Sequence, residues 1–181
     1  MTTTLLGTRV APTSTLGLRE VRTASSGDAF YAPPRQATRW KIDYAEGFSP
    51  PATQVVLGER NLAILNRLLA LPEGWDGFRA MPVTQIAAKV AMTALFEVAH
   101  DGSLSPQVVP LVDGGVQLEW HAGGYSLEIE IDALGTRHYF AVNDRGEIVL
   151  NAEPADAKVE DLLGLVERLL AELTDLVRRA R

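Results

Sequence analysis

The chain has 181 residues, 46% of them hydrophobic, which is enough for one folded domain with an appendage. Its 17 basic and 23 acidic residues give a net charge of −6, which disfavours direct binding to nucleic acid. Cysteine is absent, which excludes disulfide bonds, thiol nucleophiles and thiolate metal sites.

Residues 1–55 differ in composition from the rest of the chain. We expect residues 56–181 to form an α+β domain. The first segment holds five of the ten prolines, and its 6 basic and 4 acidic side chains give +2, which leaves −8 on the remainder. Such a composition is typical of an extended arm. The arm also carries large apolar side chains, and we expect Trp40 and Tyr44 to contact a partner. The sequence leaves open whether the arm packs on its own domain or on a neighbouring molecule.

Two helices are predicted after the arm. In the first, four leucines between residues 62 and 69 share one face, and Pro72 ends the run. The second begins after Thr84, a good N-cap residue, and its apolar residues recur at helical spacing as far as Val98.

The connector between these helices reads LPEGWDGFRAMP, residues 71–82, and contains two large aromatic side chains. We expect Trp75 and Phe78 to fold inward and to close the end of the core between the helices and the sheet. Asp76 is expected to accept backbone N–H bonds within the turn or to bond groups near Trp75. The alternative is that Trp75 and Asp76 belong to a partner-binding hot spot, a kind of site in which Trp is enriched.

A five-stranded antiparallel meander is predicted for residues 106–151. The pattern indicates two-residue loops at the first three turns and a three-residue loop at the last: Asp113-Gly114, Gly123-Gly124, Leu134-Gly135 and Asp144-Arg145-Gly146. Folding the strands at these loops places all the apolar residues on one face. The expected neighbours are Val109 and Leu118, Leu111 and Val116, Val116 and Ile131, Leu118 and Ile129, Trp120 and Leu127, Ile129 and Phe140, Leu127 and Val142, Val142 and Ile148, and Phe140 and Leu150.

The same registers place three further residues. Pro110 is expected on the polar face of an edge strand, where proline is tolerated. His138 is expected on the apolar face opposite Ile131, and Asp132 opposite Arg137.

Acidic side chains gather on the polar face of the meander. Glu119 and Glu128 are expected directly opposite each other, with Glu130 and His121 nearby. A like-charge pair of this kind destabilises a sheet unless something offsets it. Solvation, Arg137 on the neighbouring strand, a metal ion or a basic partner would each do so. We take the three glutamates as candidate partner-binding residues and assign no metal site.

The last 26 residues predict a long helix with a continuous apolar stripe and three arginines at its C-terminal end. A helix of about 24 residues spans about 36 Å, whereas strands of six or seven residues cover only about 20–23 Å. We expect the overhanging third to be covered by the arm, the other helices or a second chain. The predicted architecture is α+β: two N-terminal helices, the meander and this helix, with the helices packed on one sheet face.

Signatures of catalysis are absent from the sequence. It contains no G-x-S-x-G, no Gly-rich phosphate loop with lysine and no H-E-x-x-H. We therefore assign no catalytic residue and no cofactor. No stretch is long and apolar enough to span a membrane, and the N-terminal sequence lacks the pattern of a signal peptide, so we expect a cytoplasmic protein without a membrane partner.

The connector and the later "DGGVQLEW" together resemble a group of small uncharacterised bacterial and phage proteins. That group has a Gly-Trp-Asp/Asn-Gly connector followed by Tyr-Gly-Ala, then Pro, and later a Gly-rich turn that leads to Leu-Glu-Trp. Here Phe78, Arg79 and Ala80 replace Tyr-Gly-Ala, and the resemblance covers about residues 65–131. It implies a shared fold unit and a bacterial or phage origin, but no activity.

The expected function is therefore non-enzymatic binding of another protein, in the manner of an antitoxin, immunity factor or phage accessory protein. The alternative is a structural subunit of a larger assembly, whose arm contacts neighbouring copies. A homo-oligomer would form through the arm or the last helix. An enzyme is the third hypothesis.

Overall fold

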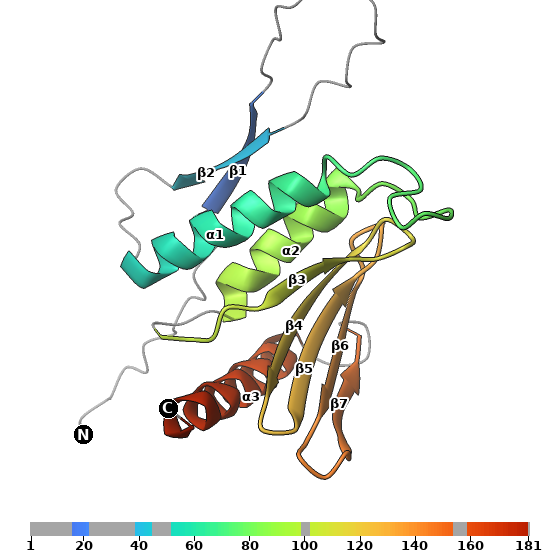
Figure 1. The fold of residues 1–181 in the computed structure, drawn as a ribbon. Helices are drawn as coiled ribbons and strands as arrows, with labels where there is room; N and C mark the ends of the chain where they lie inside the picture. The colour runs from blue at the N-terminus through green and yellow to red at the C-terminus, as the bar shows by residue number, and fades with distance from the viewer. Residues whose placement is uncertain (1–15, 22–38, 45–51, 99–101, 154–158, 181) are drawn as a thin grey trace, which may run out of the picture.

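The computed structural model describes residues 16–21, 39–44, 52–98, 102–153 and 159–180 (Figure 1). These residues form an antiparallel five-stranded sheet, a separate two-stranded hairpin and helices, which confirms the α+β class. The elements in chain order are β1 (Leu16–Val21), β2 (Arg39–Tyr44), α1 (Ala52–Leu68), α2 (Gln85–Val98), β3 (Gln107–Pro110), β4 (Val116–Ala122), β5 (Tyr125–Ile131), β6 (Arg137–Val142), β7 (Ile148–Ala152) and α3 (Val159–Arg179).

The large sheet is a simple meander, with strand order β3-β4-β5-β6-β7 and antiparallel neighbours. The predicted register of β4 with β5 is confirmed, because a two-residue loop, Gly123-Gly124, joins them. The observed pairs are Val116 with Ile131, Leu118 with Ile129, and Trp120 with Leu127.

The other three turns each have three residues between the flanking pair. Backbone N–H groups close them at 3.0 Å, from Leu111 to Gly115 O, from Asp132 to Thr136 O and from Asn143 to Glu147 O. Three residues were expected at the last turn only. The two-residue loops predicted at Asp113-Gly114 and Leu134-Gly135 are wrong. One extra loop residue turns each side chain of β3 and β6 to the opposite face from the prediction.

This shift corrects several predicted neighbours. Leu118 faces Val108, and Val116 faces Pro110, so Pro110 is on the apolar side of the edge strand. The other observed pairs are Leu127 with Ala141, Ile129 with Tyr139, Ile131 with Arg137, Glu130 with His138 and Glu128 with Phe140.

The pairing of β6 with β7 follows the prediction only at its start. Val142 faces Ile148 as expected, but a bulge after Ala141 places Phe140 opposite Asn151 rather than Leu150. Phe140 and Val142 therefore share a face with the glutamates of β4 and β5, which we call the outer face.

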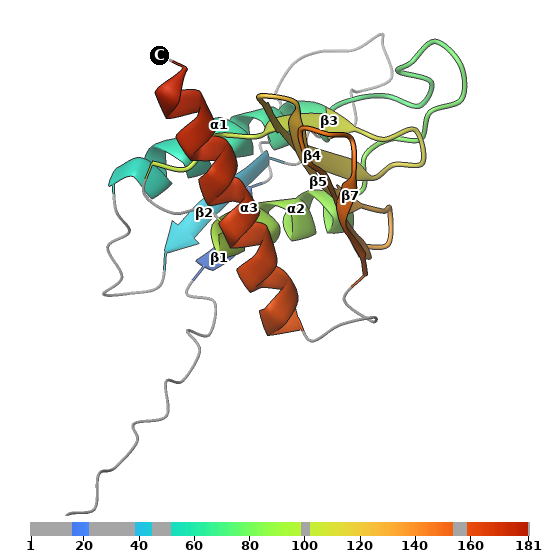
Figure 2. The same ribbon diagram turned by 90° about the horizontal axis from the view of Figure 1, so that it is seen from below.

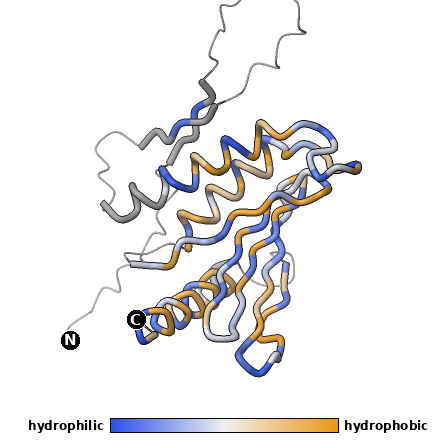
Figure 3. The backbone as a smooth tube through the Cα atoms, in the orientation of Figure 1, coloured by the Kyte–Doolittle hydropathy of each residue, from blue (hydrophilic) through white to orange (hydrophobic). Residues whose placement is uncertain are grey.

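The helices cover the other face of the sheet. Both α2 and α3 pack on β4 and β5, and α1 lies beside α2 and β3 (Figures 1 and 2). The core between these layers contains fully buried Leu118, Leu127, Ile129 and Tyr139 from the sheet. Figure 3 shows the corresponding pattern, with apolar residues running along α2 and alternating with polar ones along the strands. Among the described residues, no helix is long and apolar enough to cross a membrane.

The C-terminal part of α3 is hydrogen-bonded to a loop of the same chain. Arg178 Nη2 donates to Gly102 O at 3.3 Å, and Thr174 Oγ1 accepts from Leu104 N at 3.3 Å. Leu104 O in turn accepts from Trp120 Nε1 at 3.0 Å. The segment before β3 thus ties the end of α3 to the sheet.

The described part of the arm comprises the hairpin of β1 and β2 and the first residues of α1. Its strand β2 lies beside α1 (Figure 1). Trp40 pairs with Glu20 and Tyr44 with Leu16 through the backbone, but the side chains of Trp40 and Tyr44 lie outside the described residues. The expected boundary after residue 55 falls inside α1.

Candidate functional site

The connector between α1 and α2 is a closed loop. Gly74 N donates to Ala80 O at 2.8 Å and brings the two ends of the loop together. Asp76 Oδ1 accepts from Phe78 N at 2.8 Å and from Ala80 N at 3.1 Å, which confirms the predicted role of Asp76. The bond from Phe78 N is the main reason that the pKa of Asp76 lies below its ordinary value. The carboxylate therefore holds the loop in shape as an anion.

The two aromatic residues of the connector lie in different environments. Trp75 is half-buried, and its Nε1 donates to Met81 O at 3.1 Å, so the ring spans the loop. Phe78 is 86% exposed, so the expectation that it folds inward is wrong. Ala80 takes the inward position instead and is 1% exposed. The space beneath the connector is filled by the small side chain of Ala80, and the ring of Phe78 lies in solvent.

Backbone hydrogen bonds attach the connector to the β3–β4 turn. Met81 N donates to Val112 O at 2.8 Å, and Thr84 N donates to Gly114 O at 2.9 Å. Both bonds join segments about thirty residues apart in the chain. The tip of the β3–β4 turn is therefore fixed next to the connector.

Thr84 joins the connector to the β5–β6 turn. Its Oγ1 accepts from Ala87 N at 3.0 Å, which confirms the predicted N-cap of α2. The same hydroxyl donates to Ala133 O at 2.8 Å. Gly135 in this turn lies so close to α2 that a Cβ there would be 2.9 Å from Ile86 Cγ2. The turn after β5 thus rests on the first turn of α2.

These contacts gather exposed apolar side chains at one end of the sheet. Among the residues whose side-chain exposure the structure describes, seven large apolar residues are exposed, and five of them lie here; the other two, Ile148 and Val149, are on β7. Figure 1 shows the connector beside the β3–β4 and β5–β6 turns. We call the five residues the loop-end surface: Phe78 (86% exposed), Met81 (52%), Ile86 (54%), Val112 (63%) and Leu134 (82%).

The glutamates of the outer face lie apart from this surface, on the middle strands. Glu119 and Glu128 face each other as predicted. Gln117 Nε2 donates to Glu128 Oε2 at 2.8 Å, and His121 Nε2 lies 3.4 Å from Glu119 Oε2. Each of the two carboxylates thus has a polar partner on the same face. Glu130 is exposed, between Gln117 and His138 of the adjacent strands.

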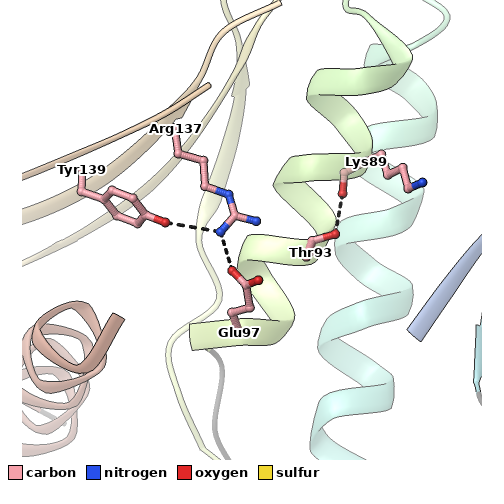
Figure 4. A network of polar contacts seen from close by, with 5 residues as sticks. All are labelled: Lys89, Thr93, Glu97, Arg137 and Tyr139. Carbon is pink, nitrogen blue, oxygen red and sulfur yellow. Dashed lines mark hydrogen bonds and ion pairs between the residues drawn. The ribbon is translucent and has the colours of Figure 1, made fainter. Parts of the chain in front are cut away.

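Arg137 does not offset these charges, contrary to one of the expectations. Because of the one-residue shift it faces Ile131 on the helix side. There its Nη1 donates to Glu97 Oε2 on α2 and to Tyr139 Oη at 3.4 Å (Figure 4). Burial opposes the charge, but the hydroxyl and the carboxylate outweigh it, so the pKa of Arg137 is raised. This ion pair links β6 to α2.

His138 is also on the face opposite to the one predicted. It pairs with Glu130 on the outer face, and its Nε2 lies 2.7 Å from Asn151 Oδ1. Across residues 16–21, 39–44, 52–98, 102–153 and 159–180, no three His, Asp or Glu side chains are placed to hold a metal ion.

Sequence reasoning singled out Trp75 and Asp76, which support the loop-end surface, but missed most of its exposed residues. Val112 and Leu134 did carry a signal. Each stands at the tip of a tight turn, a position where polar residues are usual. Comparison of the chain with protein-family models, with curated proteins and with solved structures gives no match.

Proposed function

We propose that this protein is non-enzymatic and binds another protein through the loop-end surface. The observation that carries the proposal is the gathering of five exposed apolar side chains from three chain segments at one end of the domain. Soluble proteins rarely expose apolar side chains in contiguous groups, and such groups mark interaction sites. Fully burying one side chain of this size contributes about 1.5–3 kcal/mol.

The rigidity of the backbone beneath these side chains supports the same function. The connector is closed by Asp76 and braced by Trp75, and hydrogen bonds from Met81 and Thr84 fix it to the neighbouring turns. A surface ordered in advance loses little conformational entropy when a partner binds. Trp75 and Asp76 act in this proposal as supports of the interface rather than as its exposed centre.

The biological setting that we propose follows the resemblance of the connector. It is a cytoplasmic protein of bacterial or phage origin, of the antitoxin, immunity or phage accessory type. Of the described helices, α2 and α3 pack on the middle strands of the sheet, and the exposed side chains of the loop-end surface are available to a partner.

A structural subunit of a larger assembly is the second candidate. The observation that favours it is the pair of exposed apolar residues on the edge strand β7, Ile148 (61%) and Val149 (42%). An edge strand with exposed apolar side chains is a template for pairing with another chain. In that case neighbouring copies, and not a different protein, would be the partners.

Affinity capture with the whole chain tests the leading proposal. Wild-type protein, Phe78→Ser and a matched control, Ile148→Ser, are used as baits in extract of the source cells. We expect wild type and the control to retain a common protein that Phe78→Ser loses, while all three have the same melting temperature. Retention of the same proteins by all three baits would contradict the proposal. Loss only with Ile148→Ser, together with self-association, would favour the structural subunit.

A further inference from the structure

The charges around the loop-end surface indicate the chemistry of its partner. In the segments that form the surface, residues 71–86, 111–115 and 132–136, there are four carboxylates and one guanidinium, a balance of −3. The acidic residues are Glu73, Asp76, Asp113 and Asp132, and the basic residue is Arg79. The segments that carry the exposed apolar side chains thus have an excess of acidic residues, which we call the acidic rim.

The position of this rim follows from how the loops are built. Asp113 Oδ1 accepts from Gly115 N at 2.9 Å, and Asp132 Oδ1 accepts from Leu134 N and Thr136 N at 2.8 Å. In the connector, Asp76 Oδ1 likewise accepts from the backbone N–H groups of Phe78 and Ala80. Each loop-capping aspartate lies within two residues of an exposed apolar residue, so the bonds that shape the loops also place negative charge beside the apolar surface.

Backbone hydrogen bonds favour the charged form of two of these aspartates. The bond from Thr136 N is the largest cause that lowers the pKa of Asp132, and the bond from Phe78 N does so for Asp76. Arg137, the first basic residue after the β5–β6 turn, is paired with Glu97 and does not neutralise the rim.

We infer that the partner of the loop-end surface is a polypeptide segment with apolar side chains flanked by lysine or arginine. The inference rests on the function proposed above. Complementary charge at the rim of an apolar contact accelerates association and selects against partners of the wrong sign, whereas the apolar centre supplies most of the affinity. An acidic peptide with the same apolar residues would be repelled.

Selection from a library of random displayed peptides tests this chemistry without knowledge of the natural partner. The whole wild-type chain is the target, and Phe78→Ser is used to remove peptides that bind elsewhere. We expect the surviving peptides to combine Leu, Phe or Trp with an excess of Lys and Arg over Asp and Glu. No charge preference, or an excess of acidic residues, would overturn the inference and leave the proposed function standing. If no peptide discriminates between wild type and Phe78→Ser, the proposed function fails and the inference fails with it.

Two charge variants sharpen the result with a single selected peptide. Glu73 and Arg79 are both exposed residues of the connector. We expect Glu73→Lys to weaken binding and Arg79→Glu to strengthen it, each by about two- to fivefold, the range of one exposed ion pair. Both effects should shrink at high salt. Changes of the same sign in both variants, or no change in either, would overturn the inference.

Discussion

Two turns of the sheet share one hydrogen-bonding pattern but carry different side chains at the middle loop residue. In the β5–β6 turn Asp132 Oδ1 accepts from the N–H groups of residues 134 and 136, and in the β6–β7 turn Asn143 Oδ1 accepts from those of residues 145 and 147. Both end with a glycine of positive φ, Gly135 at 92° and Gly146 at 77°. The first turn presents Leu134 at its tip, 82% exposed, and the second presents Arg145.

Comparison of the two turns shows which of their residues the turn geometry requires. Because an arginine occupies the same position in a turn of the same geometry, the turn itself does not demand a leucine. The two turns lie at opposite ends of an antiparallel meander, and only the β5–β6 turn lies beside the connector. We interpret Leu134 as a residue selected for contact with a partner.

The largest effect is expected from alanine at Gly135. A Cβ there would lie 2.9 Å from Ile86 Cγ2, whereas one at Gly146 would meet nothing within 4 Å. Gly146→Ala should destabilise the fold by about 1–2 kcal/mol through the left-handed backbone alone, and Gly135→Ala by about 2–4 kcal/mol because crowding adds to it. Urea unfolding of both variants measures the difference. Equal losses would show that the β5–β6 turn does not rest on α2.

Removal of Trp75 comes next. A fully buried Trp replaced by Ala costs about 3–5 kcal/mol, but Trp75 is half-buried, so Trp75→Ala should cost about 1–3 kcal/mol. Trp75→Phe keeps most of the ring and loses the bond to Met81 O, for which we expect about 0.5–1.5 kcal/mol. Denaturant midpoints give both values. An unchanged midpoint for Trp75→Ala would mean that the ring does not brace the connector.

A smaller and pH-dependent effect is expected at Asp132. Its folded pKa lies below the ordinary 3.8, so the unfolded state binds more protons as the pH falls through this range. The ionised carboxylate therefore stabilises the folded state at pH values above 3.8, and this stabilisation is lost as the pH falls below the folded pKa. In Asp132→Asn the amide oxygen should accept the same two backbone bonds that Asn143 accepts in the β6–β7 turn. Because an amide does not titrate, the stability of this variant should fall less at acidic pH than that of wild type. Urea midpoints at neutral and at acidic pH test this; identical pH profiles for wild type and Asp132→Asn would contradict it.

The sequence determined the register of one strand pair and left the others ambiguous. Around Gly123-Gly124 the apolar residues alternate strictly with polar ones, so only one register buries them. In β3 and β6, apolar residues stand side by side, as in Val108-Val109 and Tyr139-Phe140. A slip of one residue still buries an apolar side chain there, so hydrophobic patterning cannot choose between two and three loop residues.

The candidate site was predictable only in its local part. Asp76 and Thr84 act on residues within four positions, and both roles follow from the sequence. The loop-end surface instead depends on contacts between Met81 and Val112 and between Thr84 and Ala133. Contacts between distant segments of this kind cannot be derived from the order of residues alone.

Exchange of the tip residues between the two matched turns separates the role of Leu134 in binding from its role in the fold. Leu134→Arg and Arg145→Leu each alter one exposed side chain, so both should change the stability by less than about 0.5 kcal/mol. The measurement is binding of the captured partner to each variant by isothermal titration. We predict that Leu134→Arg loses most of the affinity and that Arg145→Leu keeps all of it. Equal affinities of the two variants, or loss with Arg145→Leu alone, would contradict the assignment of the loop-end surface as the binding site.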